Sequence, residues 1–200
     1  MKSIYLVRHA ETTWNLEGKV QGRRDTSLSI NGLAQTVKTV AFLSALPFDT
    51  IFTSPLARAR AIAEPVGVVL HIPPIVLPEL QEIDFGDWEG HTWNEIEAMY
   101  PAPLATWERK SPETRPDGGE SLADVCRRAA KVRSLVESSS GDLALVVAHG
   151  GFNRVFISVL LDLPLSSYDE FTQPNACISI FEAKDDGWQA RVIDSTCHLT

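Results

Sequence analysis

The chain has 200 residues, of which 44% are hydrophobic and 22% are charged, which is typical of a globular protein with a sizeable core. Its net charge of −8 argues against a nucleic-acid-binding protein, although a local pocket of arginine and histidine can still attract phosphate. The absence of a long apolar run predicts no membrane partner, and three cysteines without a CxxC pair indicate a cytoplasmic location.

The first predicted element is a strand that ends in two polar side chains. Residues 3–7 are mostly β-branched, aromatic or aliphatic, which predicts a buried strand. Arg8 and His9 follow it directly, and burial of these groups in a core would be costly. At the carboxyl end of an α/β sheet they would instead meet a bound anion. Taken alone, the pair fits either a surface position or an anion site with His9 as nucleophile.

A polar loop and a helix come next. Residues 11–29 are long for a plain connection, which favours a functional loop. The pattern then predicts a helix over residues 31–46 that Ser29 or Asn31 caps and Pro47 ends. The residues expected on its apolar side are Leu33, Val37, Val40 and Ala41.

Two more strands and another helix are expected in the following part of the chain. Residues 49–53 predict a strand, and Ser54 with the next proline resembles the cap and first turn of a helix that reaches about Val66. Residues 68–72 predict a third strand. Arg58 falls in the first turn of the helix, where anions bind, although a solvated helix charge fits it as well.

The remainder of the chain predicts a cover, two helices, a strand and a hairpin. Residues from about 73 to 120 are rich in proline and tryptophan and predict short helices and loops that lie as a lid over one end of the sheet. A helix is then expected over residues 121–138, with Arg127, Arg128 and Lys131 on its polar face. A buried strand over 143–148 and a helix up to about Leu163 follow. The last expected element is a hairpin of two strands, 177–182 and 188–193. The sequence therefore predicts one α/β domain over residues 1–200, with three α/β/α layers and a mixed, mostly parallel central sheet.

Charged or imidazole side chains recur where strands give way to loops or helices. His149 follows the strand over residues 143–148, and Gly150 after it would let the backbone approach a ligand closely. Glu82 lies near aromatic residues, where partial desolvation would suit acid–base chemistry. An ordinary turn and an ordinary loop acid are the plainer alternatives. Each signal is weak alone, but their order along the chain is informative.

Several separate segments match one protein family in the same order. They are residues 6–15, 20–22, 54–59, 82–90, 118–121 and 149–151. Over essentially its whole length the chain thereby resembles the histidine phosphatase superfamily, the phosphoglycerate-mutase-like group. One departure is Ala10, because the family usually has glycine after the nucleophilic histidine. A methyl group is tolerable there if the local φ is negative.

The resemblance implies a mechanism. Neutral His9 would attack phosphorus in line and become phosphohistidine, while Glu82 would protonate the leaving oxygen and later accept a proton from water. Arg8, Arg58 and His149 would stabilise the charge on the phosphoryl oxygens. The further residues that would bind the phosphoryl group are Asn15, Gln21 and Gly150. No metal ion and no cofactor is expected.

The favoured function is a metal-independent phosphomonoester hydrolase. The chain is similar to the short phosphatase branch, which includes α-ribazole phosphatase and broad-specificity phosphatases, because residues 89–93 lack the Arg-Tyr pair typical of the mutases. The expected partner is a small phosphorylated metabolite, and the protein is expected as a monomer or homodimer. Trp93, Tyr100 and Trp107 would either line the leaving-group site or pack the cover onto the sheet. The alternatives are a bisphosphoglycerate-dependent phosphoglycerate mutase and a non-catalytic phospho-ligand-binding module.

Overall fold

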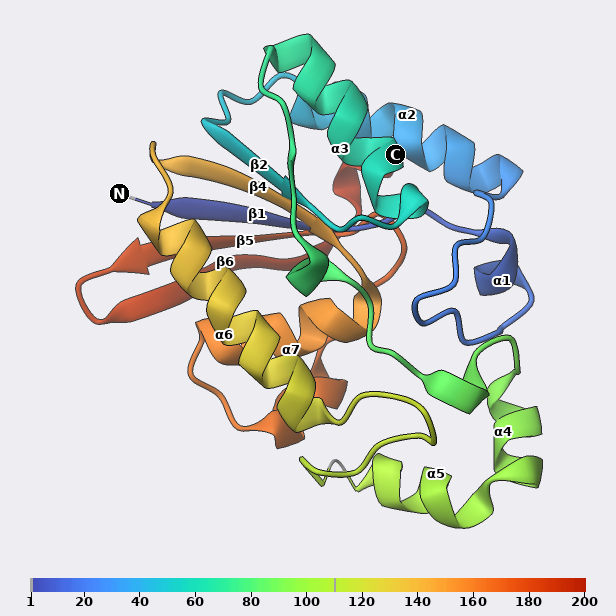
Figure 1. Cartoon of the computed structure of the whole chain (residues 1–200). Helices are drawn as coiled ribbons and strands as arrows, with labels where there is room; N and C mark the ends of the chain where they lie inside the picture. Colours follow the sequence, from blue (N-terminus) through green and yellow to red (C-terminus); the bar gives the residue numbers. More distant parts are fainter. Residues whose placement is uncertain (1, 110) are drawn as a thin grey trace.

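A six-stranded mixed sheet forms the centre of the computed structural model, which describes residues 2–109 and 111–200 (Figure 1). The strands lie in the order β3-β2-β4-β1-β5-β6. Neighbours from β3 to β1 run parallel, and β5 is antiparallel to both β1 and β6. Their bounds are β1 Ser3–Arg8, β2 Thr50–Thr53, β3 Ile75–Val76, β4 Leu143–Ala148, β5 Ile178–Lys184 and β6 Gly187–Ser195. The predicted mixed, mostly parallel sheet is confirmed.

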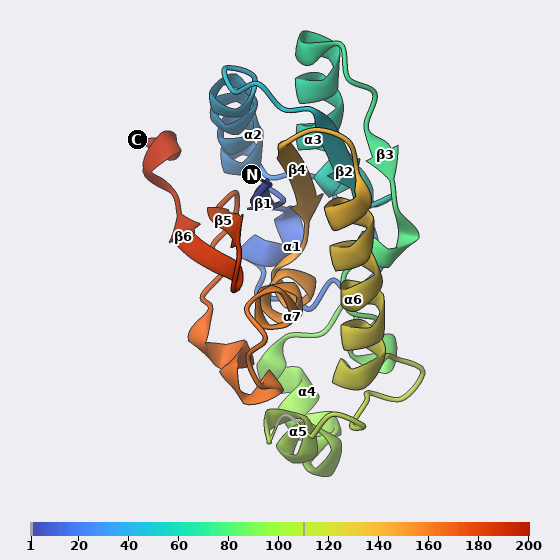
Figure 2. The ribbon, with the colours of Figure 1, turned by 90° about the vertical axis from the view of Figure 1, so that its left-hand side faces the viewer.

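Helices cover both faces of this sheet, as the turned view in Figure 2 shows. Helices α2 and α3 pack on one face, and α6 and α7 on the other. The α-helices are α1 Thr13–Leu16, α2 Ile30–Leu43, α3 Ala57–Leu70, α4 Trp93–Met99, α5 Pro101–Glu108, α6 Leu122–Ser138 and α7 Gly150–Leu160. Short 3-10 turns cover Pro78–Leu80, Gly86–Trp88, Leu165–Glu170 and Cys197–Leu199. The three predicted layers are therefore present.

The two hydrophobic cores follow from the two-residue period of the strands. On β4, Leu145 and Val147 pack toward α2 and α3, whereas Ala144 and Val146 belong to the core under α6 and α7. Because both faces are covered, the strand is apolar throughout, as the sequence predicted. Because β1, β4 and β2 run parallel, their last residues lie at the same end of the sheet.

The structure corrects the prediction around the third helix. Helix α3 runs from Ala57 to Leu70, so residues 68–70 of the predicted strand are helical, and the edge strand β3 comes later. Ser54 is not the helix cap, because Leu56 holds that position without a side-chain cap bond. The β-branched residues misled the prediction: Val68 and Val69 face solvent, where packing does not select strand over helix.

The predicted apolar face of α2 is wrong in part. Val40 packs against the core, but Leu33, Val37 and Ala41 are exposed, and the residues that α2 buries are Gly32, Thr39 and Leu43. Ser29 is the helix cap, since its hydroxyl accepts the N–H of Gly32. Gly32 lies so near the carbonyl of Glu11 that a Cβ there would come within 1.9 Å of it. The close approach of that loop turns the helix away from its more apolar side.

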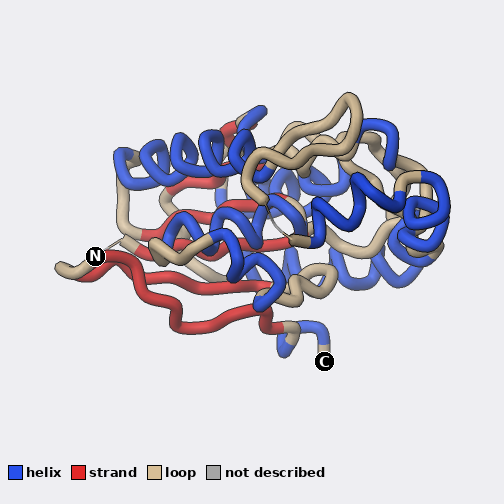
Figure 3. Tube along the Cα trace, turned by 90° about the horizontal axis from the view of Figure 1, so that it is seen from below, coloured by secondary structure: helices blue, strands red, loops and turns tan. Residues whose placement is uncertain are grey.

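Helices α4 and α5 lie beyond one end of the sheet (Figure 1). Seen from below, the strands occupy one end of the molecule, and only helix and loop occupy the other (Figure 3). The predicted short helices in this part of the chain are confirmed. None of the helices within residues 2–109 and 111–200 combines the length and the apolar character that a membrane crossing requires.

Candidate active site

Three neighbouring parallel strands bring the predicted site residues to one edge of the sheet. In the parallel pairing of β1 and β4, Arg8 is opposite Ala148, so His9 and His149 follow at the same level. The N–H of His9 donates to the carbonyl of Ala148 at 3.0 Å. Strand β2, on the other side of β4, leads to Ser54 and then to Arg58 in the first turn of α3. The strand order therefore joins the N-terminal and C-terminal parts of the site.

His9 is buried at the base of a pocket, and a hydrogen bond to one of its ring nitrogens fixes the ring. Its Nδ1 lies 2.7 Å from the carbonyl oxygen of Ala10, which makes Nδ1 the protonated nitrogen and leaves the lone pair on Nε2. Burial holds the pKa of His9 well below its ordinary value, and the charges of Arg58 and Arg8 lower it further. The imidazole is thus neutral, as a nucleophile must be.

His149 lies beside His9 and is fully buried. The two ring centroids are 5.2 Å apart. Its Nε2 is 2.7 Å from the hydroxyl oxygen of Ser54, which also accepts the N–H of Leu56 at 3.2 Å. Among the described residues His149 Nε2 is the only acceptor within hydrogen-bond distance of that hydroxyl, so we assign the hydroxyl proton to this bond, which leaves the other ring nitrogen protonated. That Nδ1 is buried and has no partner among the described residues.

Two arginines stand next to the histidines, Arg58 buried and Arg8 half-buried. Arg58 is 1% exposed, and its two terminal nitrogens donate to the carbonyls of Gly22 and Arg24, each at 2.7 Å. Arg8 donates through Nη1 to the carbonyl of Gln173. Burial lowers the pKa of both guanidinium groups, yet both stay charged at neutral pH. Within the described structure the Nε of each is buried without a partner, so both have a donor left for an anion.

The Glu82 carboxylate is held at the start of α7. It accepts the N–H groups of Gly151 at 3.0 Å and Phe152 at 2.8 Å, as well as that of its neighbour Ile83 at 2.9 Å. A helix N-terminus favours a negative group in this position. The close packing requires glycine, because a Cβ on Gly151 would lie 2.7 Å from the carboxylate. A Cβ on Gly150 would likewise lie 3.2 Å from Arg8 Nε.

A pocket of about 190 Å³ opens above these groups. Its lining includes the predicted residues Arg8, His9, Asn15, Gln21, Arg58, Glu82 and Gly150, whereas the buried His149 is not among the described lining residues. The amide oxygen of Asn15 accepts from Thr12 and Asn175, and that of Gln21 accepts from Thr12 and Thr26. With the oxygens occupied, the amide NH₂ groups are the ends that can donate to a ligand.

The pocket also contains residues that the sequence did not indicate. Arg154 lines it, with its guanidinium 5.1 Å from the ring centroid of Tyr168, another lining residue. It comes one turn after Gly150 in α7, and this four-residue spacing was the signal that could have revealed it. Lys19 and Gln173 are the other polar additions.

Of the three aromatic residues considered as walls, only Trp93 lines the pocket. Trp107 is buried and packs edge-on against Phe85 and Trp88, with centroids 5.6 and 6.0 Å apart. Tyr100 packs against the core. Most of the cover's aromatic surface therefore stabilises its packing. Within the described parts of the chain, no group of three or more His, Cys, Asp or Glu residues could hold a metal ion.

The arrangement combines three chemical capacities. The arginines and backbone N–H groups can bind an anion, a neutral imidazole presents a free lone pair, and a carboxyl group lies on the same pocket wall. Such a set suits transfer of a charged electrophile to a histidine, with a carboxyl group to exchange protons.

Comparisons with known proteins show what the chain is similar to. Residues 4–196 match the family model described as histidine phosphatase superfamily (branch 1). Phosphoserine phosphatase 1 of Hydrogenobacter thermophilus is 31% identical over 100% of this chain and 95% of its own length. Adenosylcobalamin/α-ribazole phosphatase of Salmonella typhimurium is 30% identical over 96% of each. The structure of Entamoeba histolytica phosphoserine phosphatase in complex with 3-phosphoglyceric acid has a TM-score of 0.90 and 28% identity, and the match covers both chains completely.

Proposed function

This chain belongs to the histidine phosphatase superfamily and is a phosphatase, and we propose that it hydrolyses small phosphomonoesters through a phosphohistidine formed on His9. The observation that carries the mechanism is a set of buried N–H donors without partners in the described structure. They belong to Arg8, Arg58 and His149 and lie around the neutral His9. Buried donors are normally paired, so a phosphoryl group is the partner that this site requires.

In the first step, His9 Nε2 attacks phosphorus in line. The P–N bond forms as the P–O bond to the leaving group breaks, and the electron pair of that bond goes to the leaving oxygen. The Nδ1 proton stays bonded to the Ala10 carbonyl, which orients the ring. The protonated Glu82 gives its proton to the leaving oxygen, so the product departs as a neutral hydroxyl group.

Charge spreads over the phosphoryl oxygens during this step. The Nε donors of Arg8 and Arg58 and the Nδ1–H of His149 are the groups that we assign to stabilise it. The backbone of Gly150 and the side-chain amides of Asn15 and Gln21 complete the binding site. All of these groups are fixed by other contacts before the ester arrives, so little reorganisation opposes binding.

The second step releases phosphate. Glu82, now a carboxylate, takes a proton from water as the water oxygen attacks phosphorus. The P–N bond breaks, its electron pair returns to Nε2, and inorganic phosphate leaves. His9 is again neutral and Glu82 again protonated, so one ester and one water give one alcohol and one phosphate.

The positive charge of the pocket lining favours a substrate that carries a second negative group besides the phosphate. Arg154 adds a positive charge to the wall, and it is not needed to counter Glu82, the one acid among the described lining residues. The relatives named for phosphoserine and for a complex with 3-phosphoglyceric acid act on or bind phosphoesters that carry a carboxylate. We therefore place a small carboxylated phosphomonoester in this pocket. Residues 73–120 would serve as its cover through Trp93.

A phosphatase assay with a trapping step tests the mechanism. In the presence of EDTA, we expect the enzyme to release inorganic phosphate and to form an acid-labile, base-stable phosphoenzyme on rapid quenching. His9→Ala should remove the label and lower kcat by at least about 10⁴-fold. Isomerised product without net phosphate release would favour the mutase, and binding without turnover would favour the ligand-binding module. Labelling of His9→Ala would overturn the assignment of the nucleophile.

A further inference from the structure

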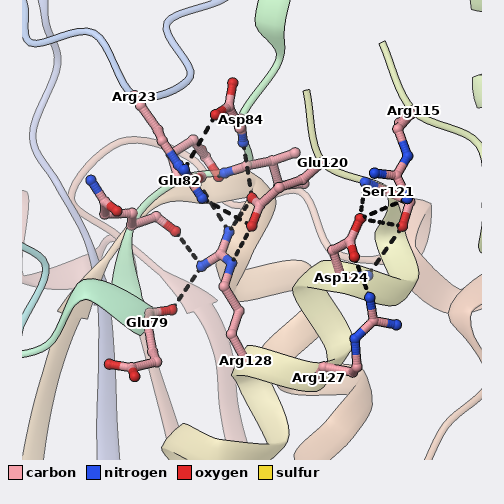
Figure 4. A network of polar contacts seen from close by, with 12 residues as sticks. Arg23, Glu79, Glu82, Asp84, Arg115, Glu120, Ser121, Asp124, Arg127 and Arg128 are labelled. Carbon is pink, nitrogen blue, oxygen red and sulfur yellow. Dashed lines mark hydrogen bonds and ion pairs between the residues drawn. The ribbon is translucent and has the colours of Figure 1, made fainter. Parts of the chain in front are cut away.

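Arg128 of α6 lies under the segment that carries Glu82, as Figure 4 shows. Its Nη1 donates to the carbonyls of Glu79 at 2.7 Å and Gln81 at 2.5 Å, and its Nη2 donates to that of Glu82 at 3.2 Å. The side chain is only 11% exposed, although the helix pattern placed it on the polar face with Arg127 and Lys131. One guanidinium group thus fixes the main chain at and just before the proposed proton donor.

The same guanidinium contacts the other support of Glu82. Its carbon atom lies 4.9 Å from the ring centroid of Phe152, over the ring face. The backbone N–H of Phe152 donates to the Glu82 carboxylate at 2.8 Å. Arg128 therefore touches both the residue whose N–H orients the carboxylate and the main chain from which the carboxylate extends.

Glu120 holds Arg128 in this position. Its two carboxylate oxygens accept from Nε and Nη2 of Arg128, each at 3.1 Å. Two hydrogen bonds also join Glu120 to Asp84. The N–H of Glu120 donates to the carbonyl of Asp84 at 2.8 Å, and the N–H of Asp84 donates to the Glu120 carboxylate at 3.1 Å. This close approach needs Gly119, because a Cβ there would lie 2.5 Å from the Asp84 carbonyl. Two residues of the segment 118–121, which the proposed chemistry leaves unused, thus have a structural role.

Arg23 extends this network to the phosphate-binding side of the pocket. It pairs with Glu120 at 2.9 Å and with Asp84 at 3.2 Å (Figure 4). Its neighbours Gly22 and Arg24 supply the carbonyls that hold Arg58. The charged residues that hold the Glu82 segment are therefore connected, through Arg23, to the loop that holds Arg58.

We propose that Arg128 and Glu120 are positioning residues for the proton transfers of Glu82. The proposal rests on the proposed function, since it assumes that Glu82 is the proton donor. Arg128 lines no part of the pocket and so acts through Glu82 and Phe152 rather than on the substrate. Proton transfer needs the carboxyl group within hydrogen-bond reach of the leaving oxygen, so a small displacement of the segment removes the acid without removing the nucleophile.

Two substrates that differ in leaving group separate these roles. An alkyl ester such as glycerol 3-phosphate releases a strongly basic oxygen and needs the acid, whereas 4-nitrophenyl phosphate releases a stable phenolate and does not. For Arg128→Met we expect kcat/KM to fall about 100-fold with the alkyl ester and less than about 5-fold with the aryl ester. Glu120→Gln should show a smaller loss of the same kind. Arg128→Lys should restore part of the alkyl activity, since lysine keeps the charge but lacks the planar guanidinium that bonds three carbonyls and both carboxylate oxygens of Glu120.

Arg127→Met is the matched control. Arg127 is the adjacent residue, its side chain is 70% exposed, and its one ion pair within the described residues is with Asp124, so neither kcat/KM value should change. The ratio of the two activities in one preparation does not depend on the fraction of folded enzyme. Equal losses for both esters in Arg128→Met would overturn the positioning role. If Glu82→Gln itself lowers kcat/KM equally for both esters, the proton-donor assignment fails, and the positioning proposal fails with it.

Discussion

The ends of β1 and β4 are nearly equivalent in position, yet they present their histidines in opposite ways. His9 and His149 follow paired residues of parallel strands, and burial lowers the pKa of both. His9 binds a carbonyl through Nδ1 and faces the pocket with Nε2. His149 binds Ser54 through Nε2 and keeps Nδ1 without a protein partner in the described structure.

The difference lies in what each partner can do. A carbonyl can only accept, so it leaves His9 with a lone pair on the opposite nitrogen, where a nucleophile needs it. A hydroxyl can also donate, so Ser54 can leave His149 with a proton on its free nitrogen, where a phosphate-binding group needs it. Two neutral imidazoles thereby acquire different roles without a difference in charge.

The largest expected effect is that of removing His149, and it distinguishes the nucleophile His9 from the hydrogen-bond donor His149. His149→Ala should lower kcat about 100- to 1,000-fold, the usual cost of one charge-stabilising donor, and the quenched enzyme should still carry phosphate on His9. Rapid-quench labelling with a radiolabelled ester measures both quantities. If His149→Ala abolished the label as completely as His9→Ala, the two imidazoles would have to act as one nucleophilic unit.

A smaller effect should come from the hydroxyl that sets the tautomer. In Ser54→Ala, His149 loses its partner, and the loss of a hydrogen bond worth about 1.4 kcal/mol corresponds to an approximately tenfold lower kcat. Steady-state kinetics with the melting temperature as a folding control would measure it. Unchanged kcat in a folded Ser54→Ala would show that the proton of His149 does not depend on this contact.

Both histidines should make stability depend on pH. Their folded-state pKa values are lowered, so the unfolded chain takes up protons below about pH 6.5 while the folded protein does not. The free energy of unfolding should therefore fall with decreasing pH, by up to about 1.4 kcal/mol per unit for each buried imidazole. Urea unfolding at pH 5, 6 and 7 measures this slope. His149→Gln should reduce it, and an unchanged slope would assign the dependence to other groups.

The smallest effect concerns Ala10, whose carbonyl orients His9. Ala10 is fully buried and is not among the residues with positive φ, so the usual glycine is not required for the backbone. Ala10→Gly should cost about 1 kcal/mol of stability and change kcat by less than about twofold. Chemical denaturation and kinetics test this. A large gain in kcat would show that the methyl group displaces the nucleophile.

The sequence predicted the strand ends well and the helix faces poorly. Arg8, His9 and His149 could be placed because a buried strand followed by a cation has few positions in an α/β sheet. Val68 and Val69 favoured a strand, but an exposed position does not enforce that preference. Leu33 and Val37 gave a false apolar face because the close approach of the Glu11 backbone fixes the orientation of α2.

Arginine roles were the hardest to predict. Arg127 and Arg128 are adjacent in the same helix, yet one is exposed and the other bridges three carbonyls and a carboxylate. Only the tertiary placement of the Glu82 segment distinguishes them. Arg154 could have been found from its helical spacing to Gly150, because residues four apart share a helix face.

The central position of β1 has a consequence for biosynthesis. During synthesis this strand emerges before its sheet neighbours β4 and β5, because helices α2, α3 and α6 lie between them in the chain. Until β4 and β5 have been made, both edges of the apolar strand β1 stay open. His9 can meet His149 only when β4 is in place, so recovery of activity during refolding would report completion of the sheet rather than formation of any helix.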